Sequence, residues 1–105
     1  MTPPGNPPYP GIFNEPHGGM TDTGKIIRDA WVFGILPETE TCEGWPMPRL
    51  ERLWEQVQAE WARYDFRVSA LPPELRERFE RIQAVALERA RAAGWDPVAE
   101  LDEDD

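Results

Sequence analysis

The sequence contains only one cysteine, Cys42, and only one histidine, His17. A single cysteine cannot form an internal disulfide, so nothing in the sequence argues for an oxidising compartment. Structural zinc sites draw on four cysteine or histidine ligands, which is more than this chain supplies. We therefore expect a fold without disulfides, and we expect no bound metal and no cofactor.

Long apolar runs are also missing. No segment approaches the ~20 apolar residues that a membrane-spanning helix needs. The opening stretch MTPPGNPPYPGIF lacks the basic region and the continuous apolar region of a signal peptide. We expect a cytoplasmic protein, and its 105 residues leave room for one small domain. The abundance of alanine, arginine, proline and glutamate is typical of proteins from GC-rich bacterial genomes.

Positive charge is scarce as well. The chain has 11 lysine and arginine residues against 20 aspartate and glutamate residues, which gives a net charge of −9. Because such a surface repels phosphate groups, we expect neither nucleic acid nor a membrane as a partner. The basic surface of another protein is a better match for it.

Residues 1–20, MTPPGNPPYPGIFNEPHGGM, are rich in proline and glycine. Proline removes backbone donors and glycine raises the entropy cost of ordering, so the pattern predicts an extended arm without regular structure. Tyr9, Ile12 and Phe13 are apolar anchors spaced along this arm. They indicate an arm that lies on its own core or on a partner; the alternative is a disordered leader.

Apolar residues at helical spacing predict three helices and therefore an all-α fold, a small three-helix bundle. The first helix is expected over residues 23–34, with Asp22 or Thr23 as its N-cap. The β-branched and aromatic residues 31–33 leave a strand possible there. The second helix is expected over residues 48–64, where apolar side chains repeat every three or four positions.

The third helix is expected to begin within residues 69–74, because proline is tolerated in a first turn and Glu74 complements the helix dipole. Gly94 is expected to end it, since glycine readily takes the left-handed conformation found after helix ends. The chain is thus divided into the extended N-terminal arm, a helical domain over residues 21–97 and a short acidic C-terminal tail over residues 98–105.

The stretch from Gly19 to Ile26, GMTDTGKI, matches the phosphate-binding loop G-x-x-x-x-G-K-[ST] except at its last position. A working loop of this kind follows a buried strand, whereas the residues before Gly19 read NEPHG. Ile26 also replaces the hydroxyl that would bind Mg²⁺. We therefore interpret the glycines as a hinge between the arm and the first helix, with Lys25 as a surface charge.

Candidates for catalytic chemistry are few. Cys42 lies among Glu38, Glu40 and Glu43, and nearby carboxylates raise the pKa of a thiol, which is the opposite of what a nucleophile needs. A catalytic pair with His17 would require the arm to hold that histidine in place. We expect no catalytic residue and no enzymatic activity. The alternative is a small subunit that completes an active site or metal site within a complex, with Cys42 or His17 contributing.

Five tryptophans are unusual in so short a chain. We expect Trp54 and Trp61 in the core, because both belong to the apolar stripe of the second helix. Trp45 and Trp95 follow glycines at the ends of elements. There they either cap the core or contact a partner, since tryptophan is enriched where interfaces bind most strongly.

The combined pattern favours a small acidic accessory or regulatory protein that binds and modulates or stabilises a larger protein or enzyme complex. A bundle below about 70–80 ordered residues rarely has more than ~3–5 kcal/mol of stability, so we expect association to complete it. A homodimeric bundle with a structural role is the alternative among binding proteins. The side chains expected to bind the partner come from the arm, the first helix and the loops: Tyr9, Ile12, Phe13, Trp31, Phe33, Trp45 and Trp95.

Overall fold

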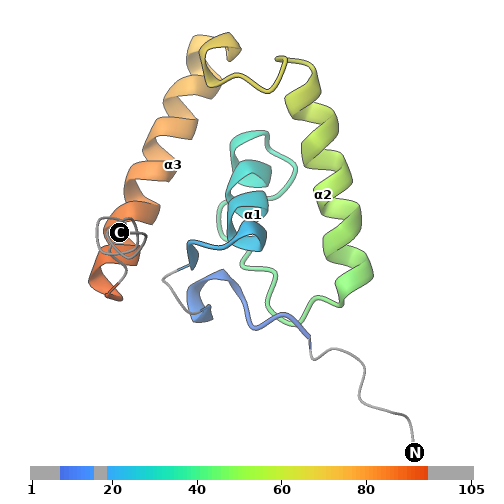
Figure 1. Ribbon diagram of the computed structural model, residues 1–105, viewed down its shortest axis with the longest axis vertical. Coiled ribbons are helices and arrows are strands. Elements are labelled where there is room, and N and C mark those ends of the chain that lie inside the picture. The colour runs from blue at the N-terminus through green and yellow to red at the C-terminus, as the bar shows by residue number, and fades with distance from the viewer. Residues whose placement is uncertain (1–7, 16–18, 95–105) are drawn as a thin grey trace, which may run out of the picture.

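The computed structural model describes residues 8–15 and 19–94. Within these residues the chain forms three α-helices and no strand: α1 (Asp22–Val32), α2 (Met47–Ala62) and α3 (Pro73–Ala92). Two short 3-10 turns, η1 (Ile12–Asn14) and η3 (Val68–Ala70), complete the elements. The predicted all-α three-helix fold is confirmed. Figure 1 shows α2 and α3 spreading apart from the loop that joins them, with α1 packed between them.

Helix α1 begins one residue earlier than predicted. The Thr21 hydroxyl, and not Asp22 or Thr23, caps it by accepting a hydrogen bond from the Gly24 N–H at 3.0 Å. Asp22 then lies in the first turn, where its charge complements the helix dipole. The helix ends at Val32, and Gly34 follows with a left-handed φ of 72°. The strand that the sequence left possible over residues 31–33 does not form.

Helices α2 and α3 follow the predicted pattern and are slightly shorter than predicted, although α2 begins one residue earlier. Pro48 lies in the first turn of α2, and the buried residues of this helix are Leu50, Leu53, Val57 and Trp61. Helix α3 begins only at Pro73, because the preceding residues 68–70 form η3. It ends at Ala92, ahead of Gly94, whose φ is 98°. On the side that faces α1, the Arg78 guanidinium donates a hydrogen bond to the Val32 carbonyl at 3.0 Å.

Aromatic side chains join the three helices near the end of α1. The Phe33 ring meets the Trp61 ring edge to face, with centroids 5.2 Å apart, and stacks parallel to Tyr64 at 6.2 Å. Trp61 in turn meets Phe79 of α3 at 6.1 Å. Such pairs contribute about 0.5–1.5 kcal/mol each beyond the area that they bury. Trp61 therefore occupies the core, as predicted.

Trp54 does not occupy the core, and that prediction was wrong. Its side chain is 51 % exposed. The inward face of α2 is taken by residues 50, 53, 57 and 61, which are spaced three or four positions apart. Trp54 lies on the flank of this stripe, and helical spacing alone does not tell a flank from a core face.

The described part of the N-terminal arm lies on the core of its own chain. The Tyr9 N–H donates to the Trp45 carbonyl at 3.0 Å, and the Gly44 N–H donates to the Tyr9 carbonyl at 2.7 Å. Ile12 is buried and forms part of η1, so this part of the arm has a regular turn that the sequence did not predict. The predicted acidic tail, residues 98–105, lies outside the described residues.

Across the described ranges, no helix has both the length and the apolar character that crossing a bilayer requires.

Candidate functional site

Three of the residues predicted to bind a partner form part of the chain's own core. Ile12, Trp31 and Trp45 are all buried. The Trp31 indole N–H donates to the Glu40 carbonyl at 2.9 Å, and the Arg49 guanidinium lies 3.6 Å from the centre of the Trp45 ring. These contacts fix the loop that follows α1. A role for the three side chains in binding a partner stays a prediction. In this arrangement they expose little surface that a partner could contact.

The remaining predicted residues differ in exposure. Phe13 is 50 % exposed, whereas Tyr9 and Phe33 are more deeply buried and pack against the core. Trp95 and the candidate catalytic histidine, His17, lie outside the described residues. Of the predicted set, Phe13 is therefore the side chain that the described structure presents most openly to solvent.

The glycines of the phosphate-loop look-alike are used for packing. A Cβ on Gly24 would lie 2.1 Å from the Gly19 carbonyl oxygen, so only glycine fits at this position of α1. The same carbonyl accepts a hydrogen bond from the Arg28 guanidinium at 2.7 Å. The close approach of residues 19 and 24 explains the glycine spacing without a nucleotide.

Glu15 connects the arm to the start of α1. Its carboxylate accepts hydrogen bonds from the Tyr9 hydroxyl and from the Thr21 hydroxyl, and Thr21 is the N-cap of α1. Burial raises the pKa of Glu15, while the Thr21 hydrogen bond and the charge of Arg28 lower it. The net direction is upward, so burial is the largest effect on this carboxyl group.

Arg28 and Asp29 are buried charged residues whose role the sequence did not reveal. They are 6 % and 1 % exposed. The Asp29 carboxylate accepts a hydrogen bond from the Trp61 indole N–H at 3.0 Å and lies 3.4 Å from the Lys25 ammonium group. Burial lowers the pKa of Arg28, which the charges of Asp29 and Glu15 oppose. The contacts between residues distant in sequence, such as Asp29 with Trp61, could not be read from local periodicity.

Cys42 is fully buried in the loop between α1 and α2. Its pKa is raised to about 12, mainly because of burial and further because of Glu40, while Arg49 opposes the shift. The predicted direction is confirmed, although the neighbouring carboxylates are only the second cause. A thiol with this pKa is almost entirely protonated at neutral pH and is a poor nucleophile.

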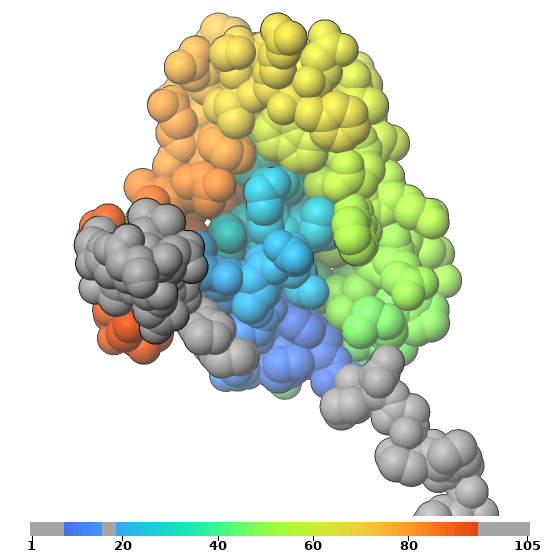
Figure 2. All heavy atoms as spheres, in the orientation of Figure 1, coloured from blue at the N-terminus to red at the C-terminus, as the bar shows by residue number. Residues whose placement is uncertain are grey.

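A groove runs between α1 and α2. Its volume is about 440 Å³, and we call it the α1–α2 groove. Met47 and Trp54 line it and are 48 % and 51 % exposed, which leaves large apolar surface in contact with water. The other lining residues are two further apolar side chains and a mainly polar edge: Ile26, Leu50, Asp22, Thr23, Lys25, Glu51 and Gln58. Figure 2 shows α1 at the molecular surface between α2 and α3.

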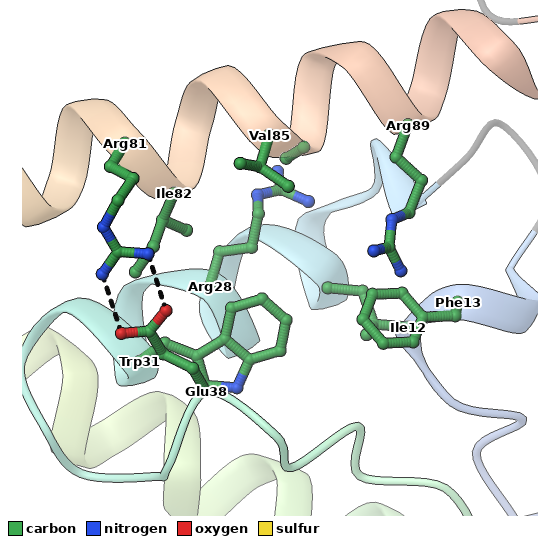
Figure 3. A pocket seen from close by; sticks show the side chains of 10 residues that line it. Ile12, Phe13, Arg28, Trp31, Glu38, Arg81, Ile82, Val85 and Arg89 are labelled. Carbon is green, nitrogen blue, oxygen red and sulfur yellow. Dashed lines mark hydrogen bonds and ion pairs between the residues drawn. The ribbon is translucent and has the colours of Figure 1, made fainter.

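A second hollow lies between α1, α3 and η1, and we call it the arginine pocket. Its volume is about 140 Å³, and Figure 3 shows the side chains that line it. The Arg81 guanidinium holds the Glu38 carboxylate with two hydrogen bonds of 2.9 Å, and these bonds lower the pKa of Glu38. The Arg89 guanidinium lies 3.8 Å from the centre of the Phe13 ring. The remaining lining residues are Ile12, Arg28, Trp31, Ile82, Val85 and Ala86.

Among residues 8–15 and 19–94, no group of three or more histidine, cysteine, aspartate or glutamate side chains is arranged to hold a metal ion.

Comparison of the chain with protein-family models, with curated proteins and with solved structures returns no match.

Proposed function

We propose that this protein is a small acidic accessory protein that binds a larger protein through the α1–α2 groove and modulates or stabilises it. The observation that carries the proposal is the exposure of Trp54 and Met47 along this groove. An exposed apolar groove of this kind is typical of a binding surface, and tryptophan is enriched among the residues that dominate binding energy.

Charge at the groove indicates the chemistry of the partner. Asp22 and Glu51 lie at its edges, and the chain carries a net charge of −9. Lys25 is the one basic residue among those that line the groove, and its ammonium group lies within 3.4 Å of Asp29. We therefore propose that the occupant is an amphipathic helix of the partner, with apolar anchors flanked by lysine or arginine.

The buried state of Cys42 favours a binding role over a catalytic one. A reactive cysteine is accessible and has a lowered pKa, whereas Cys42 is buried and has a raised pKa. The rival proposal, a subunit that completes an active site with Cys42, makes a different prediction. If Cys42→Ala abolished the activity of the assembled complex without loss of assembly, that rival would replace ours.

Site-specific photo-crosslinking in the native lysate tests the proposal. The photoreactive residue p-benzoylphenylalanine replaces Trp54 in one sample and Ala84, which is exposed on α3, in the matched control. We expect position 54, and not position 84, to yield one dominant crosslinked peptide with basic residues beside apolar anchors. A synthetic copy of that peptide should bind the intact protein, more weakly at high salt and at least about tenfold more weakly to Trp54→Ala.

Two outcomes would overturn the proposal. Crosslinks formed only between copies of this chain, together with dimers in sedimentation, would favour the homodimeric structural bundle. A dominant crosslinked peptide without basic residues, or one that binds equally to the Trp54→Ala variant, would remove the argument from the groove.

A further inference from the structure

We propose that the arginine pocket binds a small organic carboxylate whose apolar body is about the size of a benzene ring. This site lies on the α3 side of α1, whereas the α1–α2 groove lies on the α2 side, so the inference does not rest on the proposed function.

The size and lining of the pocket argue for a small apolar body. The pocket has a volume of about 140 Å³, and a cavity of ~150 Å³ with apolar walls is known to hold benzene. Trp31, Ile82 and Ile12 provide buried apolar surface on its walls. Phe13 and Val85, by contrast, are 50 % and 47 % exposed. A ligand with an aromatic ring would cover both of these side chains and remove their apolar surface from water.

The charges of the pocket argue for an anion. Arg28 comes from α1, and Arg81 and Arg89 come from α3, so the lining carries three guanidinium groups and one carboxylate, that of Glu38 (Figure 3). The lining itself therefore carries more positive than negative groups, although Asp29 and Glu15 act on Arg28 from outside it. The paired hydrogen bonds from Arg81 already satisfy Glu38, and one Arg28 nitrogen donates to the Gly19 carbonyl, which leaves Arg89 and the Arg28 Nε–H group to attract a ligand.

Arg28 supplies the most specific evidence for a ligand. This residue is only 6 % exposed, and its Nε atom has no hydrogen-bond partner among the described residues. A buried polar group without a partner is costly, and a charged donor raises that cost. A carboxylate oxygen in the pocket would accept a hydrogen bond from this Nε–H group.

A carboxylate fits these donors better than a phosphate. The Glu38 carboxylate lines the same pocket and repels a negatively charged ligand, and the repulsion grows with the charge of the ligand. A monoanion therefore gains the attraction of Arg28 and Arg89 at a smaller cost than a dianion. The planar carboxylate also matches the planar guanidinium fork.

Binding is tested by titrating the intact, isotope-labelled chain with benzoate and following its NMR spectrum. We expect saturable shifts of the Trp31 indole N–H and of the Val85 and Ala86 amides. Benzyl alcohol, which keeps the ring and lacks the charge, should bind at least about tenfold more weakly. Inorganic phosphate, which lacks the ring, should cause no saturable shift at these groups.

Three variants test the location. Val85→Trp should fill the pocket and abolish binding of benzoate, whereas Ala84→Trp places the same bulk at an exposed α3 position that does not line the pocket and should leave binding unchanged. Arg89→Gln should weaken binding of benzoate about tenfold and change the weak binding of benzyl alcohol much less, because it removes the charge that attracts the carboxylate.

The proposal is overturned if benzoate produces no saturable shift, if benzyl alcohol binds as tightly as benzoate, or if phosphate competes for the same groups. It is also overturned if Val85→Trp, with a folded spectrum, binds benzoate like the unaltered chain. None of these results changes the crosslinking expected at Trp54, so the two proposals fail separately.

Discussion

Among the three α-helices of the described residues, the shortest and the longest differ in how much of their length they bury. Helix α1 has 11 residues, and seven of them are buried, including Arg28 and Asp29. Helix α3 has 20 residues, and only Ile82 and Ala90 are buried. The difference follows from position, because α1 packs against both other helices (Figure 1). Stability is therefore concentrated in α1, whereas much of α3 remains available to solvent and ligands.

The largest expected effect on stability comes from removing the buried carboxylate of Asp29 in α1. Asp29→Ala should lower the free energy of unfolding by about 3–5 kcal/mol, because it leaves Arg28 without its neighbouring negative charge and the Trp61 indole without its acceptor. Glu80→Ala on the exposed face of α3 is the matched control and should change it by no more than about 0.5 kcal/mol. Urea unfolding followed by circular dichroism measures both. Similar losses of unfolding free energy in the two variants would contradict the inference that stability is concentrated in α1.

A second test compares two tryptophans of the same helix. Trp61→Phe removes the hydrogen bond to Asp29 and part of the aromatic cluster, so we expect a loss of about 2–3 kcal/mol. Trp54→Phe makes the same chemical change at an exposed position and should cost less than about 0.5 kcal/mol. Equal costs in thermal or urea unfolding would mean that Trp54 is part of the core after all.

Gly24→Ala tests whether packing outweighs helix propensity in α1. In an open helix this change would stabilise by about 1 kcal/mol. Here the added methyl group would lie 2.1 Å from the Gly19 carbonyl oxygen, so we expect a loss of about 1–3 kcal/mol. Chemical denaturation gives the sign directly, and a stabilised variant would show that residues 19 and 24 do not approach closely.

The smallest expected effects concern two carboxyl groups with opposite shifts in pKa. Burial raises the pKa of Glu15, whereas the Arg81 hydrogen bonds lower the pKa of Glu38. An NMR titration of the carboxyl carbons should find the two values on either side of that of an ordinary glutamate. The control, Arg81→Gln, should return the pKa of Glu38 toward the ordinary value and leave that of Glu15 unchanged. Two equal values in the unaltered chain would contradict the structure.

These shifts also set the sign of the pH dependence. Folded Glu15 holds its proton more tightly than the unfolded chain does, so its contribution to stability falls as pH rises from the unfolded to the folded pKa. Glu38 acts in the opposite direction. Its contribution is present above the unfolded pKa and is lost as pH falls through the folded pKa. In unfolding experiments across this acidic range, Glu15→Gln and Glu38→Gln should therefore change the slope in opposite directions.

The helices could be predicted because their signals are local. Leu50, Leu53, Val57 and Trp61 repeat at helical spacing, and the observed bounds of α2 differ from the predicted ones by only one or two residues. The candidate site could not be predicted in the same way. The helical spacing that correctly predicted a buried Trp61 also predicted a buried Trp54. Only the position of α1 beside α2 leaves the Trp54 ring exposed in a groove.

The sequence by itself determined the helices of the described residues and the acidic composition, whereas the pKa of Cys42 is raised mainly by burial in the folded chain. Periodicity, end signals and charge act through neighbours in the chain, so they can be read without the fold. The tertiary structure decided that Arg28 and Asp29 are buried, that Ile12 docks on its own core and that Gly24 meets Gly19. Burial depends on which distant segment covers a side chain, as Trp61 covers Asp29 from 32 positions away.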